Sequence, residues 1–428
     1  NQAGNNGVLF GDLNVRAVKD KNDNIISDGR PSLGFTGNMD TYKPAEGSAT
    51  RSDIAITDPD FKYPSLWKSN IAADYKFGDG WVATVELLYS KDINAIYHDN
   101  IGLYRTEQFV NDGGAGNARP YYNGYYSDRE GNQKAANHVV MLRNTSKGHS
   151  LYTTFQLQKN FVDGILKGLY LNGSYSFGQS RGVTDGTSSV ATSAWKYRAA
   201  LDGNAEEVGY TAGSFDGRLL LSASYTANWS KYAATSFGLI YQRYRPFRYS
   251  YCYNGDANGD SQFSNDLMYI PANFDEVKDH LLPGDFDSQE DAWKAMNAFI
   301  EQDPYLSKHR GEYAERNGAV APFANQLDLS VSHDIKIYQK NGRSHTLRFS
   351  FNIANFLNLL NRNWGVVQTT VLGNQQYQFL TIPKGQGPSA ANNYTLKYTM
   401  AKDLDETFKD NLNDVSRWQM QFGIKYIF

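Results

Sequence analysis

The chain has 428 residues, a formal net charge of −3, 40% hydrophobic residues and 14% aromatic residues. The small net charge argues against a nucleic-acid partner held through its phosphates. No stretch approaches the ~18 consecutive apolar residues of a transmembrane helix, which excludes a membrane bundle of helices. The single cysteine, Cys252, excludes an internal disulfide framework and a cysteine-based zinc site.

Residues 1–65 form the first region, which we expect to be an extracellular loop. They are rich in Asn, Asp and Gly, with one brief strand-like piece at residues 13–18. A long irregular segment of this kind is usually functional or disordered. The chain starts at Asn1 and shows no signal peptide, so we expect a processed chain or a fragment.

From residue 66 onward, apolar and polar side chains alternate with the period of two that defines a β-strand. Trp81, Val85 and Leu87, for example, alternate with Thr84 and Glu86 after a Gly-Asp-Gly turn. The pattern predicts four hairpins and one final strand, at residues 66–90, 151–177, 219–241, 327–353 and 416–428. The turn of the fourth hairpin is expected near residues 341–342.

The connections between these hairpins are much longer than the turns within them. The long, polar segments are residues 92–148, 181–216, 245–322 and 357–415. Short turns at one end and long loops at the other are typical of outer-membrane β-barrels. We therefore predict an all-β transmembrane antiparallel barrel over residues 66–428, in contact with outer-membrane lipid. A soluble β-sandwich, whose apolar faces would meet each other, is the alternative.

The pattern gives about nine spanning strands, whereas bacterial single-chain barrels have an even number. Nine strands would also leave two open edges, which lipid does not tolerate. We therefore expect the chain to be the C-terminal portion of a larger barrel, interrupted within an extracellular loop.

The last predicted strand places its apolar side chains on one face and ends on an aromatic residue. Trp418, Phe422, Tyr426 and Phe428 share this face with Met420 and Ile424. A terminal amphipathic strand of this kind resembles the signal that the barrel-assembly machinery recognises in bacterial outer-membrane proteins.

Several further stretches resemble the C-terminal barrel half of TonB-dependent receptors of Bacteroidetes, in the Oar-like group with a carboxypeptidase-regulatory-like domain. They are NNGVLFG (5–11), ITDPDFKYP (56–64), KDINAIY (91–97), YNGDANGD (253–260), NDLMYIP (265–271), QDPYL (302–306), RGEYAERNG (310–318) and NLLNRNWG (358–365). Each stretch is weak alone, but together they are specific, and the similarity runs over nearly the whole chain.

This resemblance implies a barrel of roughly 22 strands with a plugged lumen. It also implies location in the bacterial cell outer membrane and import of a nutrient ligand, with energy supplied through contact between TonB and the plug. The plug, the TonB box and the N-terminal barrel half are expected as partners, because none of them is recognisable in this chain. A structural or adhesive barrel that binds a surface partner without transport is the alternative function.

The segment from Asn254 to Asp266 is the candidate metal site. Asp256, Asn258 and Asp260 alternate oxygen-bearing side chains as calcium loops do, and Asp266 follows. The glycine expected at the sixth position is Ser261, and the closing acid comes one residue early. Asx turns in a surface loop would explain the same residues without calcium.

The segment after the sixth predicted strand is the candidate ligand-binding site, because aromatic faces and guanidinium groups suit sugars, peptides and anions. Its residues are Tyr241, Arg243, Tyr244, Arg245, Arg248, Tyr249, Tyr251 and Tyr253. Packing of an extracellular hairpin is an equally good explanation. Cys252 would be either a buried free thiol or the partner of a cysteine elsewhere in the receptor.

Residues 288–302 show helical spacing of apolar residues after a Ser-x-x-Asp start, which predicts one capped helix that packs within its loop. Residues 178–182 match Gly-x-Ser-x-Gly, but no helix is predicted after them, as a nucleophile elbow requires. The seven histidines form no metal-binding motif. We therefore do not expect an enzyme; a barrel lipase would need a Ser/His pair near the membrane rim, and none is recognisable.

Overall fold

The computed structural model describes residues 18–19, 25–27, 53–110, 119–126, 138–186, 188–338, 344–372, 376–388, 394–400 and 406–428. Most of its regular structure is strand, so the predicted all-β fold class is confirmed. Within these ranges, no helix combines the length and the apolar character needed to cross a membrane.

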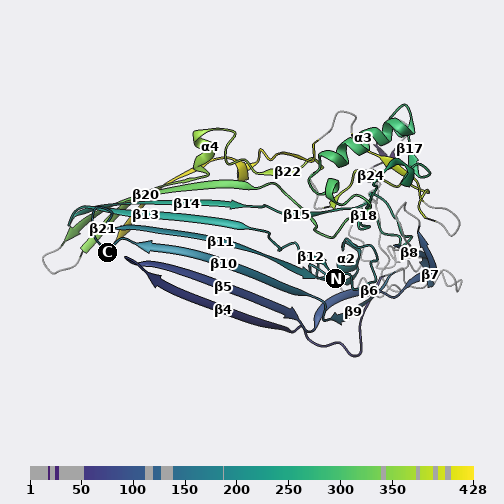
Figure 1. Ribbon diagram of the computed structural model, residues 1–428, viewed down its shortest axis with the longest axis horizontal. Helices are drawn as coiled ribbons and strands as arrows, with labels where there is room; N and C mark the ends of the chain where they lie inside the picture. The colour runs from purple at the N-terminus through teal and green to yellow at the C-terminus, as the bar shows by residue number, and fades with distance from the viewer. Residues whose placement is uncertain are drawn as a thin grey trace.

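Nine long strands run side by side along the molecule (Figure 1). They are β4 (Leu66–Phe77), β5 (Trp81–Asp92), β10 (His149–Asn160), β11 (Leu169–Gly182), β13 (Arg218–Ser230), β14 (Ala233–Tyr244), β20 (Ala324–Tyr338), β21 (Ser344–Ala354) and β27 (Gln419–Ile427). The order in the sheet is β27-β21-β20-β14-β13-β11-β10-β5-β4, every pair is antiparallel, and the two-residue strand β12 (Gly209–Tyr210) pairs with β11. The four predicted hairpins and the final strand are all present. β4 and β27 form the two ends of this strand order.

The register of the sheet separates its two faces, because directly paired residues lie on the same face. On one face, Phe155 pairs with Val85 and with Tyr175, and Tyr175 pairs with Leu219. On the other face, Gln156 pairs with Thr84. The alternation read from the sequence therefore continues from strand to strand as one apolar and one polar face.

Cross-strand hydrogen bonds connect side chains on the polar face. They join Asn70 to Glu86 (2.8 Å), Gln156 to Asn172 (2.9 Å), Thr154 to Ser176 (2.8 Å), Gln242 to Gln326 (2.9 Å) and Ser330 to Asn352 (2.6 Å). Large apolar side chains of the apolar face are exposed: Phe155 is 47% exposed and Phe422 is 64% exposed. Among the described residues of the nine long strands, only Ala234, Ala324 and Ile353 are buried apolar residues.

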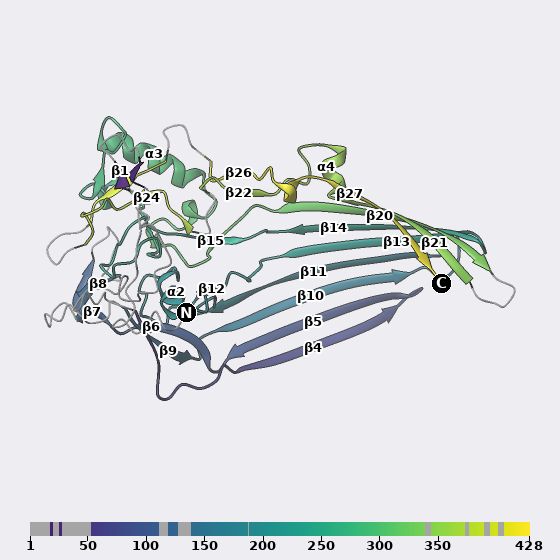
Figure 2. The same cartoon turned by 180° about the vertical axis from the view of Figure 1, so that it is seen from behind.

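The long strands are joined at one end by short turns and at the other by long segments. Gly78 and Gly80 adopt positive φ angles of 52° and 83° in the turn between β4 and β5, a conformation that favours glycine. The turn expected near residues 341–342 lies outside the described residues. Figure 2 shows the C-terminus at the short-turn end of the sheet, away from α3 (Gln289–Gln302).

The long segments form what we call the cap region, the described parts of residues 93–148, 183–217, 245–323 and 366–410. Its longer strands are β6 (Ala95–Asn100), β7 (Leu103–Val110), β8 (Arg119–Tyr125), β9 (Val139–Thr145) and β15 (Arg248–Tyr251). Its strands of two or three residues are β16 (Tyr269–Ile270), β17 (Leu281–Leu282), β18 (Glu312–Tyr313), β19 (Ala319–Val320), β22 (Gln368–Thr370), β23 (Gln376–Tyr377), β24 (Leu380–Thr381), β25 (Leu396–Tyr398) and β26 (Phe408–Asp410). The helix α2 (Ala191–Lys196) belongs to it, whereas α4 (Phe356–Leu360) lies beside the sheet (Figure 1).

The hydrophobic core lies in this cap region. Its largest cluster includes Met296, Phe299 and Ile300 of α3 together with Tyr377 and Phe379. The predicted helix is confirmed: the backbone N–H of Asp291 donates to the Ser288 side chain at 3.1 Å, and the apolar side of α3 packs within the cap region. Within these long, polar segments, pairing between distant residues forms short strands.

The first 65 residues are described only in part. β1 (Val18–Lys19) pairs with β2 (Ile25–Ser27), and most of the predicted piece at residues 13–18 lies outside the described residues. β3 (Ile54–Thr57) pairs in parallel with β9 of the cap region. This pairing connects residues 54–57 to the region that we expected to begin at residue 66.

Candidate functional site: an arginine-lined cavity in the cap region

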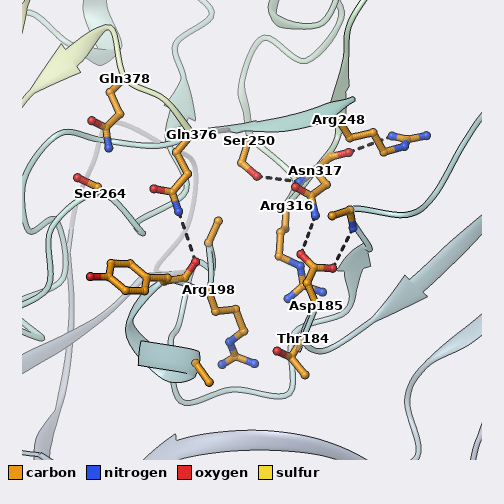
Figure 3. Close-up of a pocket in the computed structure, with 14 residues that line it drawn as sticks. Thr184, Asp185, Arg198, Arg248, Ser250, Ser264, Arg316, Asn317, Gln376 and Gln378 are labelled. Atoms are coloured by element: carbon orange, nitrogen blue, oxygen red, sulfur yellow. Dashed lines mark hydrogen bonds between the residues drawn. The ribbon is translucent and has the colours of Figure 1, made fainter. Parts of the chain in front are cut away.

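A polar cavity of about 550 Å³ lies in the cap region. Segments far apart in the sequence line it: residues after β11, the end of α2, β15, the segment before β19, and β23. Figure 3 shows Arg198, Arg248 and Arg316 around this cavity together with Gln376 and Asn317. Its volume lies within the range of about 300–1,000 Å³ that is usual for small-molecule sites.

Asn317 connects three walls of the cavity. Its backbone N–H donates to the Ser250 hydroxyl at 2.8 Å, and its side-chain amide donates to Asp185 at 3.0 Å. Its carbonyl oxygen accepts from Arg248 at 2.9 Å (Figure 3). Asn317 has a positive φ of 52°, which asparagine tolerates better than most residues. These bonds hold β15 and the segments around residues 185 and 317 together.

The three arginines have different partners. Arg248 forms an ion pair with Asp216, and its guanidinium carbon lies 4.2 Å from the centre of the Tyr210 ring. Arg198 and Arg316 bond to backbone carbonyl oxygens, including that of Val183, which both contact. Burial lowers the pKa of all three, that of Arg198 to about 10, with the Arg316 charge as a second cause.

The structure places the eight predicted ligand-binding residues in different surroundings. Tyr249, Tyr251 and Tyr253 are fully buried in the core of the cap region, so they present no surface to a ligand. Packing, the other explanation of this segment, accounts for these three tyrosines. Arg248 alone among the eight lines the cavity.

The other four predicted residues lie at or near the sheet. Arg243 and Arg245 lie over the ring of Phe323 at 4.6 and 4.2 Å from its centre. The hydroxyl groups of Tyr241 and Tyr244 donate to side chains of β20, Asn325 at 2.9 Å and Gln326 at 3.3 Å. Their contacts are thus with neighbouring strands and loops.

The predicted calcium residues lie in one turn and fit a metal site only in part. Both carboxylate oxygens of Asp256 accept backbone N–H groups, from Gly259 at 2.6 Å and from Ser261 at 2.8 Å. Asp266 pairs with Arg119 at 3.2 Å. Within the described ranges, no group of three or more Asp, Glu, His or Cys side chains is arranged to hold a metal.

The pKa values of the aspartates in this turn are nevertheless compatible with the calcium prediction. Asp260 and Asp266 are buried and Asp256 is half-buried, and burial raises the pKa of each carboxyl group, that of Asp260 to about 7. The charge of Asp256 raises the pKa of Asp260 further. The side-chain oxygen of Asn258 accepts the backbone N–H of Asp260 at 2.9 Å.

The remaining predicted features lie away from the cavity. Phe422 pairs with Phe351 and Tyr426 with Leu347, while Trp418 and Phe428 flank β27 on either side. Ser180 lies within β11, so it does not occupy a strand-to-helix turn. Cys252 is a fully buried free thiol whose pKa is raised by burial.

Sequence reasoning missed Arg198, Asp185 and the cavity itself. Arg316 and Asn317 lie in one of the stretches that carry the family resemblance, but no spacing rule connects them to residues more than 100 positions away. Comparison of the chain with protein-family models, with curated proteins and with solved structures finds no match.

Proposed function

We propose that this chain is the C-terminal barrel portion of a TonB-dependent receptor in the bacterial outer membrane, which imports a nutrient ligand. The observation that carries the proposal is the two-faced sheet. Its apolar face is exposed across the nine long strands while its polar side chains bond to each other on the opposite face. Lipid outside the barrel would suit the apolar face, and a polar lumen inside it would suit the polar face.

The ends of the sheet support the same proposal. Short turns join strands at one end and the cap region lies at the other, as expected for periplasmic turns and extracellular loops. β4 and β27 would pair with strands from the N-terminal barrel half, because a barrel in lipid leaves no open edge. The plug and its TonB contact also belong to the rest of the receptor in this proposal.

Cysteine labelling along β10 tests the membrane part of the proposal. Phe155→Cys and Leu157→Cys would face lipid, whereas Gln156→Cys and Gln158→Cys would face the lumen. In native outer membranes, a water-soluble maleimide should label the two lumen positions and leave the two lipid positions unlabelled. Cys252 contributes little background because it is buried. Equal labelling of neighbouring positions would contradict a lipid-facing sheet.

Transport is tested separately from membrane insertion. Uptake of labelled peptides and oligosaccharides is compared in cells with and without TonB, for strains that carry or lack this protein. Uptake that requires both proteins supports the receptor function. Binding to cells without uptake, unchanged when TonB is removed, would favour the structural or adhesive barrel.

A further inference from the structure

The lining of the cavity carries more positive than negative charge. Three arginines line it, of which Arg248 is paired with Asp216, and Asp185 is the one acidic side chain among its lining residues in the described part of the chain. The Asp185 carboxylate accepts bonds from the Asn317 amide at 3.0 Å and from the Ala212 backbone N–H at 2.9 Å. It therefore serves as a hydrogen-bond acceptor for neutral groups and not as the direct ion-pair partner of an arginine.

Arg198 and Arg316 are buried charges that form no direct ion pair with a carboxylate among the described residues. Their exposed fractions are 6% and 3%, and within the described ranges neither makes an ion pair. Among the acids, Glu207 raises the pKa of Arg198 most, but it forms no ion pair with Arg198. Its carboxylate accepts the backbone N–H of Leu201 at 2.8 Å. Buried charges in proteins are normally paired, because removing a charge from water is costly.

Hydrogen-bonding capacity also remains on both arginines. Their outer guanidinium nitrogens bond to backbone carbonyls of Val183, Gly203 and Gly182. Among the described residues, the buried Nε atoms of Arg198 and Arg316 have no hydrogen-bond partner. A group that brings negative charge into the cavity would compensate the charge of the two guanidinium groups.

We propose that this cavity binds a small organic anion, with a carboxylate or phosphate group held next to Arg198 and Arg316. Both groups offer the planar or clustered oxygens that guanidinium recognises. The rest of the ligand would carry polar groups, because Gln376, Gln378, Ser250 and Ser264 supply amide and hydroxyl groups to the lining. The volume of about 550 Å³ fits a molecule the size of a sugar acid or a dipeptide.

Binding is measured by calorimetry on the whole protein extracted from the outer membrane, without any transport step. The failure of this inference is therefore distinguishable from failure of the proposed import function. The probes are matched pairs: glucuronate against glucose, alanyl-alanine against its C-terminal amide, and inorganic phosphate alone. We expect saturable binding of at least one charged probe and none of its neutral counterpart. Binding of phosphate but of neither carboxylate would identify a phosphorylated ligand.

The key variant is Gln378→Glu, which adds a negative charge to the cavity wall without removing a guanidinium that holds loops together. Affinity for the charged probe should fall about tenfold or more, because a carboxylate in the lining repels an anion held in the same cavity where water is scarce. The neutral variant Gln378→Met should bind the anion with an affinity within about threefold of the parent's, because it leaves the charge of the cavity unchanged.

Arginine variants complete the test. Arg198→Gln should abolish binding, and circular dichroism checks that the variant keeps the parent's fold. Arg105→Gln removes a charge from an ion pair outside the cavity and should leave the affinity unchanged. Equal binding of charged and neutral probes, no binding of any anion to the parent, or an unaltered affinity in Gln378→Glu would overturn the inference.

Discussion

Arg119 and Asp266 form a buried ion pair in the cap region, with 3.2 Å between the guanidinium nitrogen and the carboxylate oxygen and side-chain exposures of 0% and 1%. Arg119 also donates to the carbonyl oxygen of Leu267 and lies over the ring of Tyr253 at 5.6 Å from its centre. The other oxygen of Asp266 accepts the Ala257 backbone N–H at 2.7 Å. The pair thus connects β8 to the aspartate-rich turn across 147 residues of sequence.

Replacing one partner of this pair should destabilise the cap region strongly. Arg119→Met leaves the Asp266 carboxylate buried without its charge partner, at a cost of about 3–5 kcal/mol. Arg105→Met is the matched control, because Arg105 is about half exposed in its pair with Asp202. It should cost less than about 1 kcal/mol. Thermal or denaturant unfolding compares the two, and similar losses would contradict the assigned burial of the pair.

Tyr251 and Tyr377 give a test of buried hydrogen bonding by a tyrosine hydroxyl. The Tyr251 hydroxyl donates to Asp303 at 2.6 Å and lies 3.3 Å from the Tyr249 hydroxyl, whereas the buried Tyr377 hydroxyl has no hydrogen-bond partner among the described residues. Tyr251→Phe should therefore destabilise the protein by about 1–3 kcal/mol, since the acceptor is charged. Tyr377→Phe, in the same cluster, should be neutral or slightly stabilising. The prediction fails if unfolding free energies show the reverse order.

Two histidines of the cap region should make acid pH unfavourable for folding. Burial lowers the pKa of both His98 and His138, with charges of Arg198 and Lys196 as further causes. A folded pKa below the unfolded value of about 6.5 stabilises the fold above pH 6.5. This contribution is lost as pH falls below that value, because protonation then favours the unfolded chain.

The measurement is the melting temperature between pH 8 and pH 5 for the parent and for His98→Gln/His138→Gln. Asp260, with its pKa raised to about 7, acts in the opposite direction over the same range, so the comparison between the two proteins is the test. The variant should lose less stability than the parent on acidification. Parallel pH profiles would show that neither histidine contributes.

The aspartate-rich turn gives a test by metal addition and removal. A cation would compensate the repulsion between the half-buried Asp256 and the buried Asp260. If the turn binds calcium as its sequence predicts, about 1 mM calcium should raise the melting temperature, and a chelator should reverse the shift. Asp260→Asn should lose the calcium response, whereas Asp285→Asn, elsewhere in the cap region, should keep it. A parent protein that does not respond to calcium contradicts the prediction.

Substitution of Phe428 tests the assembly of the protein separately from its stability. Its side chain is 90% exposed and stacks on Tyr426 at 5.9 Å between ring centres. Phe428→Ser should change the unfolding free energy by no more than about 0.5 kcal/mol, as is usual for surface substitutions. If the final strand carries the assembly signal, the amount of protein in the outer membrane should still fall several-fold. Lys425→Ser, on the polar face of the same strand, is the control and should assemble normally.

The sequence alone was sufficient to predict the long strands. Phe155, Gln156 and Leu157 alternate in the sequence as they alternate between faces in β10, because the period of a strand is a local property of the backbone. The short turn at Gly78 and Gly80 and the cap of α3 by Ser288 were readable for the same reason.

The cap region and its cavity were decided by tertiary structure. Arg198, Arg248 and Arg316 come from three separate segments, and only the folded chain brings them to one cavity. The same is true of Tyr251, which looked like a ligand contact because its neighbours are aromatic and basic, yet lies in the core against Asp303. Local sequence patterns determine the period and the caps of one element, whereas burial and charge pairing depend on segments that are distant in the sequence. The partners of the Arg119–Asp266 pair, for example, are 147 residues apart.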